Sequence, residues 1–212
     1  MEDRTSKSSS PPEISLAAIV LAAGRSSRMA PHNKLLLQQY GETVLRSVVR
    51  NVLQCIDEVS VVVRHDSEAS GAALVELRVR IVRNRDADEG MASSIRAGLN
   101  SLKPARKGVL IALGDMPCVT SRHLSLLIDA FRSSAVNRTV VPTFAARRGN
   151  PILWCARYFR ELQSLKGDIG ARHLLIRDAA DLIAVEMPDD GVLIDVDTPD
   201  DWQQLTGGSQ IA

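Results

Sequence analysis

The part of the sequence best suited to chemistry is a short run of small and basic residues that directly follows an apolar segment. Residues 21–29 read Leu-Ala-Ala-Gly-Arg-Ser-Ser-Arg-Met, and a lysine follows at Lys34. Small residues let a backbone come close to a ligand, and amide N–H groups in such a turn can bind an anion. Arg25, Arg28 and Lys34 add three cations, enough to neutralise a triphosphate. The segment predicts a phosphate-binding loop, although a turn with solvated basic residues has the same composition.

Two aspartates stand where they could hold a divalent cation. Asp115 follows the apolar run 108–113, and Asp197 lies in a late acidic segment. Mg²⁺ prefers oxygen ligands and usually takes one or two carboxylates, with water and phosphate supplying the rest. In an extended strand, Asp195 and Asp197 would point to the same side. Each aspartate also has a plainer interpretation, as a turn or cap residue at Asp115 and as part of the cap of a helix that begins at Pro199.

The hydrophobic pattern predicts the elements that would position these residues. Short continuous apolar runs, typical of strands buried on both faces, alternate with segments whose apolar residues are three and four positions apart, as in helices. The predicted strands cover residues 15–21, 58–63, 79–82, 108–113 and 138–142, and the predicted helices cover 43–53, 67–77, 91–102 and 121–133. This alternation implies an α/β fold with a doubly wound, mostly parallel (mixed) sheet flanked by helices. Ligands bind such sheets at the carboxyl ends of the strands, where Gly24, Asp115 and Asp197 are all expected.

The pattern loosens beyond Pro151, where we expect a helix over residues 170–178 and two late strands near 184–186 and 192–195.

The overall composition excludes several classes of function. A net charge of +1 and an aromatic content of 3% argue against a polyanion binder and against a base-stacking platform for single-stranded nucleic acid. No apolar run approaches the roughly 20 residues that span a bilayer. From these features we expect neither nucleic-acid nor membrane partners. Three widely spaced cysteines without a C-x-x-C pair are typical of reduced thiols, so we expect a cytoplasmic protein.

The loop is neither a Walker loop nor a dinucleotide-binding fingerprint. It resembles L-A-(A/G)-G-x-(S/G)-x-R-M followed by a lysine, a signature of nucleotidyltransferases with a nucleotide-diphospho-sugar transferase fold. The blocks that resemble those of molybdenum cofactor cytidylyltransferases lie at residues 89–99, 114–117, 148–151, 167–172 and 195–199. The resemblance covers residues 16–205, with a loose fit only at residues 30–33.

The resemblance implies a role for each matched residue. The catalytic residues that it implies are Arg25, Arg28, Lys34 and Asp115, and the ligands of a Mg²⁺ cofactor are Asp115 and Asp197. The nucleotide-binding residues are Leu21, Ala22, Ala23, Gly24, Arg25, Lys34, Glu89, Gly90, Ser94 and Asp115, and the acceptor-binding residues are Arg148, Asn150, Asp168 and Arg172. Ser94 is preferred to Ser93 as a contact to the base, although helix capping accounts for either serine.

The implied reaction is transfer of CMP from CTP to the phosphate of molybdopterin, which yields molybdopterin cytosine dinucleotide and pyrophosphate. Ala23 favours CTP, because guanylyltransferases of this group usually carry glycine there, although one methyl group discriminates by only about 1–3 kcal/mol. The acceptor phosphate would attack the α-phosphorus in line, with Mg²⁺, Lys34, Arg25 and Arg28 stabilising charge. The implied partners are CTP, molybdopterin or the molybdenum cofactor, and a molybdenum hydroxylase that receives the product.

One nucleotidyltransferase domain is expected over residues 14–206, with a nucleotide-binding half at 14–135 and an acceptor-binding half at 136–206. Residues 1–13 are polar and Ser-rich and are expected to form a disordered tail, with a second tail at 207–212. Two alternatives stay open. One is nucleotidyl transfer to a different phosphate, such as an isoprenoid precursor or a sugar phosphate, and the other is a non-catalytic carrier or chaperone for the molybdenum cofactor.

Overall fold

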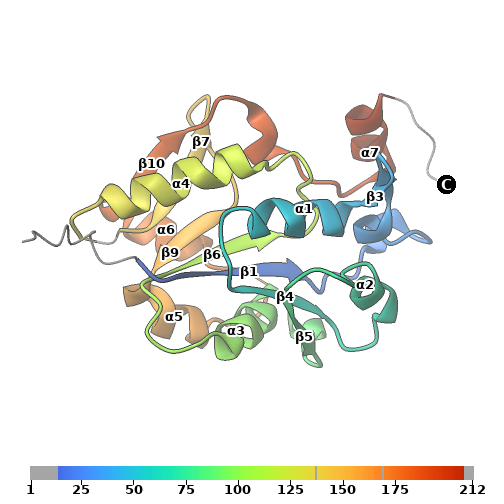
Figure 1. The fold of residues 1–212 in the computed structure, drawn as a ribbon, viewed down its shortest axis with the longest axis horizontal. Helices are drawn as coiled ribbons and strands as arrows, with labels where there is room; N and C mark the ends of the chain where they lie inside the picture. Colours follow the sequence, from blue (N-terminus) through green and yellow to red (C-terminus); the bar gives the residue numbers. More distant parts are fainter. Residues whose placement is uncertain (1–13, 137, 169, 208–212) are drawn as a thin grey trace, which may run out of the picture.

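A central mixed sheet organises the chain in the computed structural model, which describes residues 14–136, 138–168 and 170–207 (Figure 1). The predicted tail at 1–13 lies outside the described residues, as does all of the predicted tail at 207–212 except Gly207, which follows α7 directly. The strands of the sheet are β1 (Leu16–Ala22), β4 (Val59–Arg64), β5 (Arg80–Asn84), β6 (Gly108–Leu113), β7 (Val140–Phe144), β8 (Arg147–Arg148), β9 (Ile152–Cys155) and β10 (Ile183–Glu186). Their order is β10-β7-β9-β6-β1-β4-β5, with β8 paired to β7. A separate two-stranded ribbon joins β2 (Gln38–Gln39) and β3 (Glu42–Thr43).

The strands from the amino half of the chain are parallel, as the alternating pattern predicts. Strand β1 pairs with β4 and β6, and β4 pairs with β5, all in parallel. Strand β9 then lies between β6 and β7 and is antiparallel to both, and β10 pairs in parallel with β7. The prediction of a mostly parallel, mixed sheet is confirmed, although β9 itself was not predicted.

Helices cover both faces of the sheet. The α-helices are α1 (Val44–Leu53), α2 (Glu68–Ala72), α3 (Met91–Ser101), α4 (Ser121–Ser133), α5 (Phe159–Ser164), α6 (Arg172–Arg177) and α7 (Pro199–Thr206). The short 3₁₀ helices are η1 (Ser27–Met29), η2 (Lys34–Leu36), η3 (Ala87–Glu89), η4 (Ala156–Tyr158), η5 (Ala179–Asp181) and η6 (Asp190–Leu193). In Figure 1, α1 and α4 lie above the sheet, and α3 and α5 lie below it.

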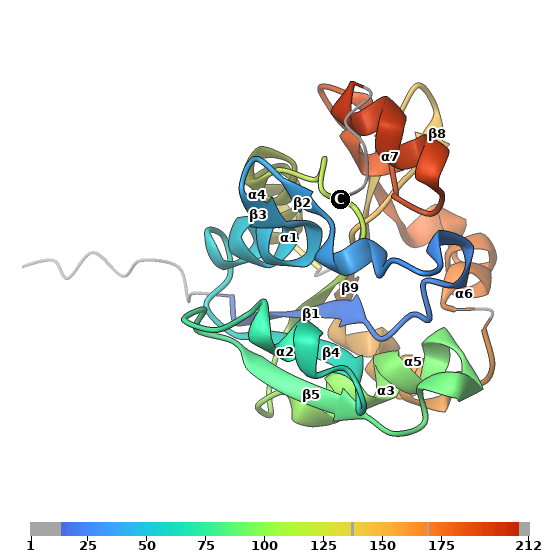
Figure 2. The same ribbon diagram turned by 90° about the vertical axis from the view of Figure 1, so that its right-hand side faces the viewer.

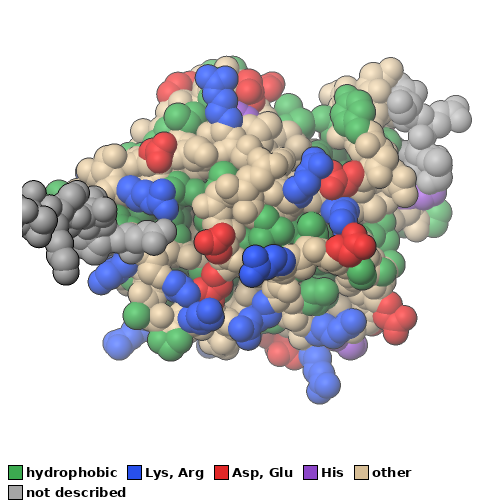
Figure 3. All heavy atoms as spheres, viewed as in Figure 1, with side chains coloured by type: hydrophobic (Ala, Val, Ile, Leu, Met, Phe, Trp, Pro, Cys, Tyr) green, Lys and Arg blue, Asp and Glu red, His purple; other side chains and the backbone are tan. Residues whose placement is uncertain are grey.

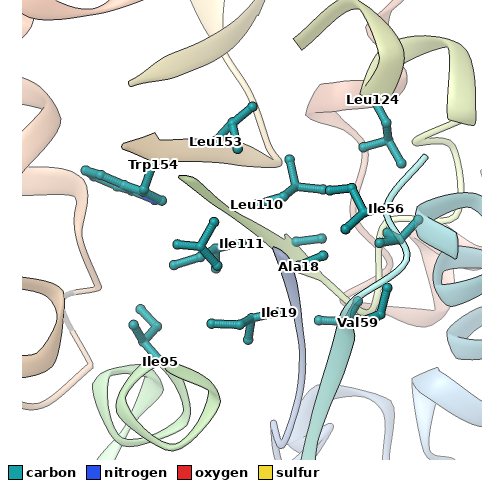
Figure 4. Packing of buried hydrophobic residues seen from close by; sticks show 14 of the residues in the cluster. Ala18, Ile19, Ile56, Val59, Ile95, Leu110, Ile111, Leu124, Leu153 and Trp154 are labelled. Carbon is teal, nitrogen blue, oxygen red and sulfur yellow. The ribbon is translucent and has the colours of Figure 1, made fainter. Parts of the chain in front are cut away.

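Strand β1 runs through the middle of the core because its side chains are apolar on both faces. Ala18 and Ile19 are both fully buried. Figure 4 shows Ile19 directed towards Ile95 of α3, whereas Ala18 and Leu110 lie on the side of Leu124 in α4. Burial of a large aliphatic side chain contributes about 1.5–3 kcal/mol. This packing holds β1, and with it the start of the loop that follows, in one place.

Figure 2 shows the molecule from the edge of the sheet at which the parallel strands end. Two backbone hydrogen bonds bring separate segments together there. The N–H of Gly114, just after β6, donates to the carbonyl of Leu21 in β1 at 2.9 Å, and the N–H of Val196 donates to the carbonyl of Asp115 at 2.9 Å. The loop after β1, the turn after β6 and the segment before α7 therefore meet at one edge.

The predicted strand over residues 192–195 is wrong, because the chain there forms η6 and then an irregular segment. The Asp189 carboxylate accepts a hydrogen bond from the Gly191 N–H at 2.9 Å, and the Val192 carbonyl accepts one from the Asn150 N–H at 2.9 Å. The Gly191 N–H and the Val192 carbonyl are therefore already paired and do not form hydrogen bonds with a neighbouring strand. The other late strand is confirmed as β10, and the predicted helix over 67–77 shortens to α2 followed by turns.

The surface carries both signs of charge, as a net charge of +1 requires. Figure 3 shows basic and acidic side chains on the same face, with apolar and uncharged groups between them. Among the described residues, no helix combines the length and the apolar character needed to cross a membrane.

Gly98 allows α3 to pack directly against β1. A methyl group at Gly98 would lie 2.5 Å from Cγ2 of the buried Ile19. We expect Gly98→Ala to lower the free energy of unfolding by about 1–3 kcal/mol, because over-packing displaces side chains and backbone. Gly71→Ala in α2 is the matched control. A methyl group there would approach only Arg83, at 3.8 Å, so helix propensity should make that change neutral or stabilising. Urea unfolding measures both changes, and a Gly98→Ala protein as stable as the wild type would contradict this packing.

Candidate functional site

A cavity of about 550 Å³ opens at the carboxyl edge of the sheet. The loop after β1 forms one wall, η3 and the start of α3 form another, and the segments that carry Asp115 and Asp197 close it. The predicted nucleotide, catalytic and metal residues that line this cavity are Leu21, Ala23, Gly24, Arg25, Arg28, Lys34, Glu89, Gly90, Ser94, Asp115 and Asp197. Ala22 differs from these residues, because its side chain is buried at the end of β1 and does not line the cavity.

Gly24 leaves the loop open on its cavity side. A methyl group at this position would meet no protein atom within 4 Å, so packing within the protein does not require the glycine. Neither the Gly24 nor the Arg25 backbone N–H donates to another described residue. Open space beside amide donors without a partner is the environment that a bound anion requires.

Lys34 lies at the centre of the site and bridges two carboxylates. It begins η2, which Asn33 caps by accepting a hydrogen bond from the Leu35 N–H at 3.1 Å. The Nζ atom of Lys34 is 2.5 Å from Oδ2 of Asp115 and 2.5 Å from Oδ1 of Asp197. Burial alone would lower the pKa of Lys34, but the carboxylates of Asp115 and Asp197 together outweigh burial and raise this pKa above its ordinary value. The ammonium group therefore stays charged at neutral pH.

Hydrogen bonds to the backbone hold Asp197 beside Asp115. Val196 is tied to the Asp115 carbonyl, and the Asp197 N–H donates to the Asp201 carboxylate at 3.0 Å. The same carboxylate caps α7 together with Thr198, so the predicted cap is confirmed. This segment is not a strand, so period-two geometry does not direct its aspartates, yet Asp195 and Asp197 both line the cavity as expected. Tertiary hydrogen bonds place Asp197 in the site instead.

The pair formed by Asp115 and Asp197 fits a magnesium ion in its chemistry. One oxygen of each carboxylate contacts the same Lys34 Nζ atom, so the two oxygens are close enough to share a single cation. Mg²⁺ takes this number of carboxylates when water and phosphate supply its other ligands. Within the described residues, no group of three or more His, Cys, Asp or Glu side chains is arranged to hold a metal ion. A metal here would depend on these two aspartates and on ligand oxygens, and it would have to displace Lys34.

The two loop arginines are held by acidic side chains. Arg28 pairs with Asp197 at 2.8 Å, and Arg25 pairs with Asp88 of η3 at 2.9 Å. Arg64 shares Asp88 at 2.7 Å. Hydrogen bonds from Arg64 and Arg25 hold the pKa of the Asp88 carboxyl below its usual range. The side chains of Arg25 and Arg28 are 65% and 69% exposed, so both are free to turn towards a bound phosphate.

A second cavity, of about 730 Å³, adjoins the first. The residues that line both cavities are Leu21, Met91, Leu113 and Asp168. The predicted acceptor-binding residues Arg148, Asn150, Asp168 and Arg172 all line the second cavity. It has an apolar wall that includes Ile152, Trp154 and Leu175.

The second cavity is basic. Arg172 makes no ion pair with a described residue, and Arg148 donates only to the carbonyl of Leu175, at 3.3 Å. Arg147 also lines the cavity and was missed, although it directly precedes the matched block at 148–151. Asp168 is already engaged, because its carboxylate accepts a hydrogen bond from the Met91 N–H at the start of α3 at 3.1 Å. The arginines and the apolar wall together suit an anionic ligand that carries a flat ring system.

Sequence reasoning also missed Asn84 and Asp88. Asn84 is the last residue of β5, and its side chain contacts Ser93 and Ser94. The rule that ligands bind at the carboxyl ends of parallel strands is a signal that could have found Asn84. Asp88 has no comparable signal, because its contact with Arg25 joins residues that are distant in the sequence.

Together, the mostly parallel sheet, the basic loop after β1 and the two adjoining cavities suit an α/β protein of the nucleotidyltransferase class. Comparison with known families agrees with this class. Residues 18–182 match the family model described as the MobA-like NTP transferase domain, and the chain belongs to this family.

Individual relatives cover nearly the whole chain. Purine catabolism protein PucB of Bacillus subtilis (strain 168) is 32% identical over 200 residues, which are 90% of this chain and 95% of PucB. The molybdenum cofactor cytidylyltransferase of Escherichia coli (strain K12) is 26% identical over 188 residues, or 87% of this chain and 92% of the relative.

The crystal structure of Rv0371c from Mycobacterium tuberculosis H37Rv superposes with a TM-score of 0.80 and 27% identity, covering 91% of this chain and 98% of Rv0371c. A structure of Rv0371c in complex with manganese superposes with a TM-score of 0.74 and 27% identity, covering 92% of this chain and 100% of that chain. The resemblance to nucleotidyltransferases with a nucleotide-diphospho-sugar transferase fold is confirmed.

We expect Lys34 to compete with a divalent cation for Asp115 and Asp197. Lys34→Met should therefore bind Mn²⁺ without nucleotide about threefold to tenfold more tightly than the wild type, because the ammonium no longer neutralises both carboxylates. The pKa of Lys34 is raised, so the competition in the wild type persists as the pH rises from neutrality towards 9. Electron paramagnetic resonance of free Mn²⁺ measures the affinity.

Lys103→Met is the matched control, since Lys103 lines a cavity at the opposite, amino-terminal edge of the sheet. This variant should bind Mn²⁺ like the wild type. Unchanged or weaker binding by Lys34→Met would show that Lys34 does not compete for the metal position.

Proposed function

We propose that the protein transfers CMP from CTP to the phosphate of molybdopterin, with release of pyrophosphate. The observation that carries this proposal is the bridge from Lys34 to Asp115 and Asp197, in a cavity that adjoins a second, arginine-lined cavity. Membership of the MobA-like family supports nucleotidyl transfer, and the relative named molybdenum cofactor cytidylyltransferase supports the two substrates.

The first cavity is the proposed site of the nucleoside triphosphate. The open backbone at Gly24 would receive phosphate oxygens, and Arg25 and Arg28 would exchange their present carboxylate partners for the same oxygens. Arg25 and Asp88 form an exposed ion pair, and such pairs contribute little to stability, so a triphosphate could replace this contact at little cost. Ala23 lines the cavity with its methyl group, which supports CTP over GTP.

The second cavity is the proposed acceptor site. Arg148 and Arg172 would bind the acceptor phosphate, and the apolar wall beside Trp154 would contact the ring system of the pterin. Asn150 would offer hydrogen bonds to the polar edge of the pterin. The residues shared by the two cavities support this assignment, because an acceptor phosphate near them would lie next to the triphosphate, as an in-line reaction requires.

The proposed step is attack by an acceptor phosphate oxygen on the α-phosphorus of CTP. A new P–O bond forms while the bond from the α-phosphorus to the oxygen that bridges it to the β-phosphate breaks, and that oxygen leaves with pyrophosphate. The acceptor is already an anion, so no general base is required. Asp115 and Asp197 would hold a Mg²⁺ ion, which supplies stabilisation of developing negative charge when bound. Lys34, released from these carboxylates, would bind the phosphate oxygens.

A nucleotide panel tests the proposed reaction. We expect pyrophosphate release from CTP with molybdopterin to exceed release from GTP, ATP and UTP, and to require the acceptor. Asp115→Asn should lower kcat/KM by about 100-fold or more, because the charge that holds the metal is lost. Asp129→Asn, at an exposed position of α4, is the isosteric control and should retain wild-type activity.

Each other outcome of the panel contradicts the proposal in a defined way. Pyrophosphate release only with a sugar phosphate or methylerythritol phosphate would show that molybdopterin is not the acceptor. Pyrophosphate release only with GTP would show that CTP is not the nucleotide. Binding of molybdopterin without pyrophosphate release from any nucleotide would indicate a carrier.

The division into two cavities predicts that KM effects can be separated. Arg172→Ala should raise the KM for molybdopterin about tenfold, because a charge-assisted contact to its phosphate is lost. The KM for CTP should change by less than about twofold, since Arg172 lies outside the first cavity. Steady-state kinetics with each substrate varied in turn measures both constants, and Arg132→Ala at the opposite edge is the control. An equal rise in both constants would refute separate sites.

A further inference from the structure

Asn84 is a buried polar residue that lies directly behind the nucleotide cavity. Its side chain is part of the closed structure, with the residue only 4% exposed, and it does not line the cavity. Its amide group makes three hydrogen bonds. Nδ2 donates to Oγ of Ser93 at 2.9 Å and to Oγ of Ser94 at 3.0 Å, and Oδ1 accepts from the Asp86 N–H at 2.9 Å.

The backbone fixes which end of this amide faces the serines. The Asp86 N–H can only donate, so the oxygen of Asn84 must face Asp86. The amide nitrogen then faces Ser93 and Ser94 and donates one hydrogen to each. The orientation of Asn84 follows from the hydrogen-bond network, and each serine oxygen must act as an acceptor towards it.

The two serine hydroxyl groups differ in where their own protons go. Ser93 donates its hydroxyl proton to the Gly90 carbonyl at 2.9 Å, and this carbonyl also accepts the Ser93 N–H at 3.2 Å. The Gly90 carbonyl, which lies four residues before Ser94, thus already accepts two hydrogen bonds from Ser93. The hydroxyl proton of Ser94 is donated to no other described residue. Ser94 lines the cavity, whereas Ser93 does not.

We propose that Asn84 is a positioning residue for nucleotide selection, which keeps the Ser94 hydroxyl as a hydrogen-bond donor directed into the nucleotide cavity. A fixed donor suits a base that presents an acceptor, and cytosine presents two adjacent acceptors, O2 and N3. Asn84 acts only through Ser94 and does not contact the base. This inference rests on the proposed function, because it takes the ligand of the cavity to be CTP.

Asn84→Asp reverses the hydrogen-bonding sense of this network with little change of shape. The new carboxylate still accepts from the Asp86 N–H, but its second oxygen can only accept, so Ser94 donates to it and presents lone pairs to the cavity. We expect CTP to bind about tenfold more weakly, as when a buried acceptor faces another acceptor. The KM for CTP should rise while kcat changes by less than about twofold, because the contact is present before and during the reaction.

One further ligand and two further variants separate the effect of hydroxyl reversal from the effect of added charge. Inorganic triphosphate lacks a base, so its affinity reports only the charge effect and should fall less than about threefold in Asn84→Asp. Asn84→Leu removes the donor without adding charge and leaves the Ser94 hydroxyl free to rotate. It should weaken CTP about threefold and leave inorganic triphosphate unchanged. Asn100→Asp, on the exposed face of the same helix as Ser94, is the matched charge control and should bind CTP like the wild type.

A double-mutant cycle tests whether Asn84 acts through Ser94. Ser94→Ala should weaken CTP by a factor similar to that of Asn84→Asp. In the Ser94→Ala background, Asn84→Asp should add no loss for CTP beyond the loss seen with inorganic triphosphate. Isothermal titration calorimetry measures all affinities without acceptor, and thermal unfolding verifies that each variant is folded.

Three results would overturn the assignment: equal losses for CTP and inorganic triphosphate in Asn84→Asp, additive losses in the double variant, or unchanged CTP affinity in Ser94→Ala. Failure of the proposed function is seen separately. In that case the wild type releases no pyrophosphate from CTP and molybdopterin, whereas the binding cycle involves neither acceptor nor turnover. A wild type that binds GTP more tightly than CTP would overturn both.

Discussion

The half-buried ammonium of Lys34 holds together three segments that are far apart in the chain. Lys34 itself begins η2, and its two partners are Asp115, which follows β6, and Asp197, which precedes α7. Charges at such a site lose hydration, and only close partners of opposite sign offset that loss. Lys34 and the two carboxylates meet this requirement for one another. In the proposed reaction the same groups would exchange partners with a metal ion and a triphosphate, because these ligands supply replacement charges of both signs. The arrangement is thus both a structural contact and the centre of the proposed chemistry.

The two cavities are joined by backbone contacts as well as by shared lining. The start of α3 packs against the segment that carries Asp168, with hydrogen bonds from the Met91 N–H to its carboxylate and from the Ala92 N–H to the Gly167 carbonyl. Gly90 permits this contact, because a methyl group there would lie 2.7 Å from the backbone of Gly167. One helix therefore forms part of the wall of the first cavity and also holds Asp168, which lines both cavities. In-line transfer requires such a fixed relation between two bound substrates.

A chain with a net charge of +1 could still bind a triphosphate, because Arg25, Arg28 and Lys34 lie together beside one cavity. Exposed guanidinium groups of Arg25 and Arg28 pair with the exposed Asp88 and with the partly buried Asp197. Exposed pairs contribute little to stability, so exchanging them for phosphate costs little folding free energy. The buried amide of Asn84 is different, because both its nitrogen and its oxygen have defined partners, and reversing the amide would set donor against donor at Asp86.

The sequence by itself determined the buried strands β1, β4 and β6, helix α4, the loop at residues 21–29 and the cap of α7, because these depend on local periodicity and on short-range hydrogen bonds. It also indicated that Gly24, Asp115 and Asp197 lie near one edge of the sheet. Only the tertiary structure decided that Lys34 bridges Asp115 and Asp197, that residues 192–195 are not a strand, and that Asn84 donates a hydrogen bond to Ser94. These features depend on hydrogen bonds and ion pairs between segments distant in the chain, and no local pattern specifies which of those segments will meet.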